Sequence, residues 1–131
     1  MRALTLGLLL FMAALPAVGG GVRVPNNAAY AAECGTCHVA YPPQLLPAAS
    51  WRELMAGLDK HFGSDASLEP ALAKEIGQFL AEHAGRRGGT ALRITETRWF
   101  LKEHRKEMTP GRNPADCAAC HAGAEKGIYE D

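Results

Sequence analysis

The sequence predicts a small all-α domain of about five short helices joined by irregular loops. Apolar side chains recur three and four residues apart, which is the spacing of one helix face. Glycine and proline, with 14 and 8 copies among 131 residues, interrupt the chain at short intervals. No stretch shows the convincing apolar–polar alternation of a half-buried strand. A chain of this length is expected to form one domain.

The N-terminal segment, residues 1–19, has the composition of a secretory signal peptide. Arg2 supplies the positive charge, Leu4 to Leu15 form the apolar run, and small residues around Ala17 offer a cleavage site. An uncleaved anchor is the alternative, although the apolar run is short for a membrane span. We therefore expect residues 20–131 to form the mature domain, exported and without a transmembrane span after signal cleavage.

The first helix is expected from Tyr30 to His38, with Asn26 or Asn27 as its N-cap. The prolines at 42, 43 and 47 then predict an irregular loop, because proline lacks a backbone N–H and fixes φ.

The second helix is expected to begin at Trp51, because Ser50 and Glu53 have the spacing of a capping box. Its inward face continues to His61, and Gly63 is placed to end it.

The third helix is expected to follow Asp65 or Ser67 as N-cap, with Pro70 in its first turn. Four apolar residues form its buried stripe, and three glycines then break it. The stripe comprises Leu72, Ile76, Phe79 and Leu80, and the glycines are Gly85, Gly88 and Gly89.

The fourth helix is expected from Glu96 to Met108 with Thr95 as its cap, and Pro110-Gly111 stops it. Asn113-Pro114 then opens a last helix.

All four cysteines lie in two C-x-x-C-H motifs, Cys34-Gly35-Thr36-Cys37-His38 and Cys117-Ala118-Ala119-Cys120-His121. This spacing is the attachment signature of c-type haem. On one helical turn, two thiols can bind the two vinyl groups of a haem while the next imidazole binds its iron. The sequence therefore predicts two covalently bound haem c groups, with the helices packed around them.

Zinc or disulfide chemistry is the alternative for these cysteines. A four-cysteine zinc site has two C-x-x-C pairs, but usually with a short spacer, whereas residues 38–116 lie between the pairs here. A thioredoxin-like motif is found within a βαβ pattern, which this chain lacks.

Each haem iron has a second axial position, and three histidines remain outside the motifs: His61, His83 and His104. His61 and His104 fall on inward helix faces and are the predicted ligands. His83 also faces inward, but its place at a helix end favours a role in capping backbone carbonyls. Met55 and Met108 are expected to fill gaps in the core.

Chain geometry favours local pairing of these ligands. His61 lies one loop and one helix after His38, which would pair them on the first haem. His104 lies one helix and one turn before His121, which would pair them on the second haem. Crossed pairing needs longer closures and stays open.

Taken together, these segments resemble the small bacterial dihaem cytochrome c family, often abbreviated DHC. The resemblance is carried by the paired motifs, by Trp51-Arg52-Glu53-Leu54-Met55 to His61-Phe62-Gly63, and by Ile94-Thr95 to His104. It implies a mostly helical domain with two six-coordinate, bis-histidine haems, and His61 and His104 match the distal positions. It also implies redox partners: a monohaem oxygen-binding cytochrome c, a membrane b-type cytochrome, or both.

The function expected from these observations is periplasmic electron transfer by two low-potential haems, without catalytic residues. Export agrees with the motifs, because bacteria attach haem covalently outside the cytoplasm. A haem enzyme or gas sensor with one open or labile axial position is the alternative. A formal net charge of +0 argues against a general nucleic-acid binder, which would carry a basic excess.

Overall fold

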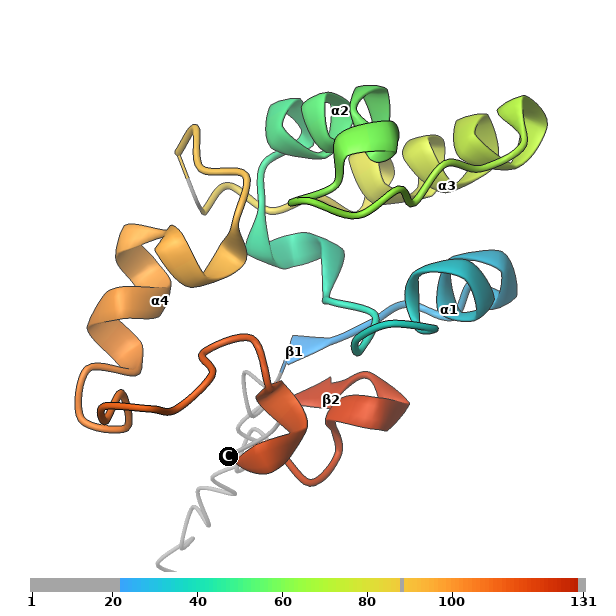
Figure 1. Cartoon of the computed structure of the whole chain (residues 1–131). Coiled ribbons are helices and arrows are strands. Elements are labelled where there is room, and N and C mark those ends of the chain that lie inside the picture. Colours follow the sequence, from blue (N-terminus) through green and yellow to red (C-terminus); the bar gives the residue numbers. More distant parts are fainter. Residues whose placement is uncertain (1–21, 88, 130–131) are drawn as a thin grey trace, which may run out of the picture.

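The computed structural model describes residues 22–87 and 89–129, and the predicted signal peptide, residues 1–19, lies outside them. In this part the chain is mostly helical, with short α-helices, 3-10 turns and one very small sheet (Figure 1). The prediction of a small all-α fold is confirmed. None of the described helices is long and apolar enough to cross a membrane.

Four α-helices and five 3-10 turns make up the described fold. The α-helices are α1 (Ala28–Cys34), α2 (Ala48–Ala56), α3 (Pro70–Glu82) and α4 (Arg98–Glu103). The 3-10 turns are Pro43–Leu45, Leu58–Lys60, Ile94–Glu96, Cys117–Ala119 and Ala124–Lys126.

Two helices begin with a side-chain cap. Asn27 accepts a hydrogen bond from the Tyr30 N–H at 2.8 Å, which confirms one of the two caps predicted for α1. In α4 the cap is Thr97 and not Thr95, because Thr97 accepts from the Phe100 N–H at 3.1 Å. The 3-10 turn over residues 94–96 moves the helix start two residues along the chain.

The other two predicted caps are wrong. Helix α2 begins at Ala48, so Ser50 lies inside its first turn, where it is buried. The cause is Pro47, whose carbonyl already accepts from the Trp51 N–H at 3.2 Å. Helix α3 follows Glu69 without a side-chain cap.

All four α-helices are shorter than predicted, and α3 spans only Pro70–Glu82 although it was expected to begin after Asp65 or Ser67 and to continue to Gly85. Helix α1 ends at Cys34, α2 at Ala56 and α4 at Glu103. Only a 3-10 turn, Cys117–Ala119, stands where the last helix was expected.

A two-stranded antiparallel sheet joins the two ends of the described chain. Strand β1 (Val22–Arg23) pairs with β2 (Ile128–Tyr129), with Val22 opposite Tyr129. Strands of two residues are too short to show alternation, so no sequence pattern indicates them. The pairing holds the segment after the second C-x-x-C-H motif against the start of the domain.

The core lies between α1, α2 and α3 and reaches α4 through Ile94 and Phe100. Two hydrogen bonds fix the proline loop against the core. Trp51 Nε1 donates to the Pro43 carbonyl at 2.8 Å in a buried bond, and the Tyr30 hydroxyl donates to the Tyr41 carbonyl at 2.6 Å in a partly buried one. The buried apolar side chains of the cluster are Tyr30, Leu45, Leu46, Trp51, Ile76, Phe79, Leu80, Ile94 and Phe100.

Candidate haem sites

The first C-x-x-C-H motif straddles the end of α1. Cys34 is the last helical residue and is half-buried, whereas Cys37 and His38 follow in an exposed turn. Thr36 tightens this turn by donating to the Glu33 carbonyl at 3.0 Å. Burial, and secondarily the charge of Glu33, raise the pKa of the Cys34 thiol to about 11. No disulfide joins any two of the four cysteines, all of which lie in the described part of the chain.

The second motif is held by a different local structure. Asp116 caps the 3-10 turn Cys117–Ala119 by accepting from the Ala119 N–H at 3.2 Å. Cys117 is half-buried and Cys120 is exposed, the same order of exposure as in the first motif. Burial raises the pKa of Cys117, with a further contribution from Asp116.

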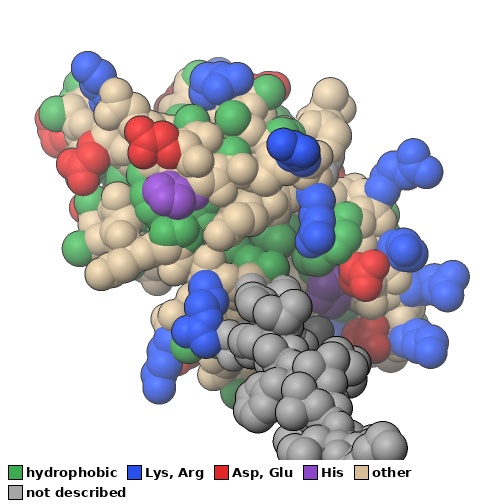
Figure 2. All heavy atoms as spheres, turned by 180° about the vertical axis from the view of Figure 1, so that it is seen from behind, with side chains coloured by type: hydrophobic (Ala, Val, Ile, Leu, Met, Phe, Trp, Pro, Cys, Tyr) green, Lys and Arg blue, Asp and Glu red, His purple; other side chains and the backbone are tan. Residues whose placement is uncertain are grey.

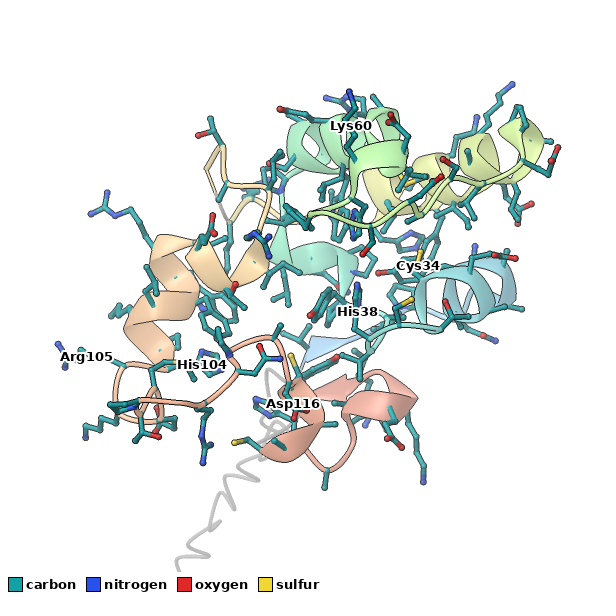
Figure 3. The ribbon with its side chains drawn as sticks, in the orientation of Figure 1. Cys34, His38, Lys60, His104, Arg105 and Asp116 are labelled. Atoms are coloured by element: carbon teal, nitrogen blue, oxygen red, sulfur yellow. The ribbon has the colours of Figure 1, made fainter. Side chains whose placement is uncertain are left out.

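The structure brings each motif histidine next to one of the other predicted ligands. The ring centroids of His38 and His61 lie 6.3 Å apart, and those of His104 and His121 lie 6.1 Å apart. Figure 3 places His38 close to the end of α1 and His104 at the end of α4. The two histidine pairs therefore occupy separate parts of the molecule, and each joins residues close in sequence.

These separations fit an iron atom between the two rings. Two imidazoles that bind one metal from opposite sides, with metal–nitrogen bonds of about 2.0 Å, have ring centroids roughly 6.3 Å apart. By contrast, the rings of His38 and Tyr41, which are in direct contact, are 4.6 Å apart. Both histidine pairs therefore leave a gap that matches one bound metal atom.

Hydrogen bonds fix the tautomer of two of these histidines. Nδ1 of His38 lies 2.8 Å from the Val39 carbonyl, and Nδ1 of His104 lies 3.1 Å from the Phe100 carbonyl. A carbonyl only accepts, so Nδ1 must be the protonated nitrogen in both rings. The Nε2 lone pair is left available, as in metal-binding histidines generally.

His61 is held without such a bond. Its Nδ1 is buried and has no hydrogen-bond partner among the described residues. Burial lowers the pKa of His61, and the nearby His38 and Arg93 lower it further. The neutral, metal-binding form of the imidazole is therefore favoured. The buried Tyr129 hydroxyl is likewise without a partner in the described part of the chain.

His83 lies elsewhere. It is the C-cap of α3, where its backbone N–H and its Nδ1 both approach the Phe79 carbonyl, at 3.1 and 2.9 Å. Its ring packs against that of Phe79, with centroids 4.7 Å apart. This is the carbonyl-capping position that the sequence favoured for His83.

A hollow of about 610 Å³ connects the two motifs. Tyr41 spans the same region, since its hydroxyl donates to the Ala115 carbonyl at 3.2 Å, two residues before Cys117. The lining comes from both motif regions: Ala31, Gly35, Thr36, Cys37, His38, Val39, Ala40, Asn113, Ala115, Asp116, Cys117 and Glu125.

The ligand arrangement suits haem better than zinc. Within residues 22–87 and 89–129, no three His, Cys, Asp or Glu side chains gather into a group that could hold a metal ion. A structural zinc site needs four such ligands, whereas haem supplies four nitrogens of its own and takes two from the protein. A haem iron therefore requires a pair of imidazoles from the protein, and each of the two sites offers such a pair.

Aromatic rings pack against all four paired histidines, including Phe62 against His61 with centroids 4.8 Å apart, and the sequence indicated only part of this. Phe100, four residues before His104, shares its helix face, so the spacing indicated that contact. Tyr41 against His38 and Tyr129 against His121 lie in a loop and a two-residue strand. Neither position has a periodic pattern from which the contact could be found.

Comparison with known proteins places these features in context. A family model described as dihaem cytochrome c matches residues 30–129. A crystal structure of DHC purified from Rhodobacter sphaeroides is 45% identical, with a TM-score of 0.73, covering 81% of this chain and 99% of that one. A diheme cytochrome c from the same organism is 41% identical, with a TM-score of 0.75, covering 82% and 99%.

A third solved structure, a diheme cytochrome c from Shewanella baltica, is 42% identical with a TM-score of 0.69. The match covers 82% of this chain and 89% of that one. No curated protein matches the chain.

Proposed function

The chain belongs to the dihaem cytochrome c family, and from that premise we propose that it is an exported electron carrier with two bis-histidine haems. The observation that carries the proposal is the pair of histidine gaps, 6.3 and 6.1 Å between ring centroids. Each gap accepts one iron, and each joins a motif histidine to a histidine outside the motifs.

In this proposal Cys34 and Cys37 hold the first haem by thioether bonds, and His38 and His61 bind its iron. Cys117 and Cys120 hold the second haem. The ligands of its iron are His121 and His104. The two short ring separations support local pairing. His83 has no part in either site, because it is engaged at the end of α3.

The chemistry that bound haem supplies is a one-electron couple of iron at each site. The protein's part is to fill both axial positions, so that the iron has no place for a substrate. Two imidazoles also give a lower reduction potential than an imidazole with a methionine. Met55 and Met108 instead pack against the hydrophobic core. We therefore propose an electron carrier and not an enzyme, because with both axial positions filled the iron would have no place for a substrate.

The two sites are proposed to exchange electrons with each other. Residues of both motifs line one hollow, and the hydrogen bond from Tyr41 to Ala115 ties the loop after the first motif to the segment before the second. This tether supports a short distance between the two attachment regions.

The redox partners are proposed to be a monohaem oxygen-binding cytochrome c, a membrane b-type cytochrome, or both, in the periplasm. The exposed second cysteine of each motif brings the haem attachment to the surface, where a small and transient interface suffices. Basic side chains gather on the side of the molecule where α4 lies (Figure 2). From residue 98 to 107 the exposed basic side chains are Arg98, Lys102, Arg105 and Lys106, and they outnumber the two exposed acidic ones, Glu103 and Glu107. The basic side chains favour an acidic partner surface.

Rapid mixing tests the transfer itself. We expect the anaerobically reduced protein to reduce two molecules of an oxidised, oxygen-binding monohaem cytochrome c per molecule, one electron from each haem. The measurement is stopped-flow absorbance at wavelengths that separate the two proteins.

The matched control is His83→Ala, which removes an imidazole outside both proposed sites and should leave the amplitude unchanged. Absence of electron transfer from the fully reduced protein would contradict the proposed partner class.

A further inference from the structure

We propose that the two haem sites differ in the relative orientation of their axial imidazoles, and that Tyr41 and Phe100 act as positioning residues that fix this difference. The inference rests on the proposed function, because it requires each histidine pair to bind one iron. It goes further in assigning a distinct electronic structure to each site.

The ring planes show the difference directly. The imidazoles of His38 and His61 are inclined by 27°, whereas those of His104 and His121 are inclined by 71°. The centroid separations of the two pairs are nearly equal, at 6.3 and 6.1 Å. Each site therefore has two histidines at nearly the same separation, and the two sites differ in how far one ring is rotated relative to the other.

At the first site Tyr41 fixes the plane of His38. The two rings are stacked, with centroids 4.6 Å apart and planes inclined by 24°. Tyr41 is itself held at both ends: its hydroxyl donates to the Ala115 carbonyl, and its own carbonyl accepts from the Tyr30 hydroxyl. Together with the bond from His38 Nδ1 to the Val39 carbonyl, this leaves the imidazole little freedom to rotate.

At the second site Phe100 fixes the plane of His104. Their rings are stacked at 4.0 Å between centroids and 14° between planes, and the Phe100 carbonyl accepts from His104 Nδ1. Phe100 is only 5% exposed and belongs to the hydrophobic core, so it cannot follow a rotation of the imidazole. Trp99 meets the same imidazole at an angle of 81°, with centroids 6.2 Å apart.

The relative plane of two axial imidazoles decides how the d orbitals of ferric iron split. Each imidazole donates π electron density into the d orbital perpendicular to its own plane. Two parallel rings act on the same orbital and separate it from its partner, whereas two perpendicular rings act on different orbitals and leave them nearly equal in energy. Near-equal orbitals retain orbital angular momentum, so the magnetic anisotropy of the second site should be larger.

Low-temperature electron paramagnetic resonance of the oxidised, fully haem-loaded protein tests this. We expect two low-spin signals in equal amounts: one rhombic, with resolved g values, and one strongly anisotropic, dominated by a single large g value. Two rhombic signals, or two strongly anisotropic ones, would overturn the inference and leave the bis-histidine proposal standing. A high-spin signal from one haem would instead contradict the proposed function.

Two substitutions assign the signals to their sites. Tyr41→Leu should shift the rhombic signal alone, and Phe100→Leu should shift the anisotropic signal alone, because each removes the stacked ring and leaves the histidine in place. Tyr41→Phe keeps the stacked ring and loses only the hydroxyl that donates to the Ala115 carbonyl, so its rhombic signal should lie closer to that of the original protein than the Tyr41→Leu signal does. If neither leucine variant moves its signal, the positioning role is wrong.

A matched control separates orientation from core damage. Phe79 is 7% exposed in the same core, but its ring contacts His83 and Tyr30 and no proposed ligand. Phe79→Leu should therefore lower stability about as much as Phe100→Leu while leaving both signals where they are. If Phe79→Leu shifts the anisotropic signal by the same amount, Phe100 acts through general packing.

Discussion

Replacing His104 with alanine should leave the second haem five-coordinate and turn it into a carbon monoxide site. His61→Ala should do the same at the first haem. The ring centroid of the removed imidazole lies 6.1 Å (His104) or 6.3 Å (His61) from that of its partner across the proposed iron position. The one histidine outside both pairs, His83, is engaged with the Phe79 carbonyl. Titration of the reduced variants, followed in the Soret band, should show one carbon monoxide bound per molecule, and two in the double variant.

The control for these variants is His83→Ala. His83 is occupied with the Phe79 carbonyl at the end of α3, so its removal should open neither haem and bind no carbon monoxide. If the His83→Ala variant bound carbon monoxide and the His104→Ala variant did not, the ligand assignment would be wrong.

Protein made without haem attachment should fail to fold cooperatively. The described core is a single small cluster, and the hollow of about 610 Å³ beside the motifs would have to remain filled by water. Buried His61 Nδ1 and the Tyr129 hydroxyl also have no partner among the described residues. Loss of two covalently bound groups should therefore cost about 5 kcal/mol or more, which is comparable with the whole stability of a small domain.

Far-UV circular dichroism measures the helix content and the cooperativity of unfolding of the haem-free protein. Protein produced with Cys34, Cys37, Cys117 and Cys120 all changed to alanine should show reduced helix content and no sigmoidal melting curve. Variants that lack only one cysteine pair should carry one haem, and the midpoint of their thermal unfolding should be lower than that of the protein with two haems. Full helix content with cooperative melting in the four-cysteine variant would contradict a haem-dependent core.

The existence of the helices could be predicted from the sequence, but most of their ends could not. Spacing placed Ile76, Phe79 and Leu80 correctly on one buried face of α3. Ser50 is not the cap because α2 already begins after Pro47. A capping-box pattern does not show whether the helix begins at its own serine or at a residue shortly before it. Strands β1 and β2 are only two residues long and depend on contacts between the chain ends.

The candidate site was more predictable than the fold, for a chemical reason. Haem attachment needs fixed residue types at fixed spacing, so Cys34, Cys37 and His38 stand out without any structural knowledge. The partners of the motif histidines could be narrowed to three candidates by counting imidazoles. The rotation of each ring could not be predicted, because it depends on Tyr41 and Phe100 meeting the histidines in space.

The central claim is that both haems carry two histidines and are closed to external ligands. The most direct test is to add carbon monoxide to the reduced, unmodified protein at neutral pH and to record the Soret band. We expect no shift, because the proposed coordination fills both axial positions of both irons. A shift that corresponds to one or two bound carbon monoxide molecules per protein would contradict the claim.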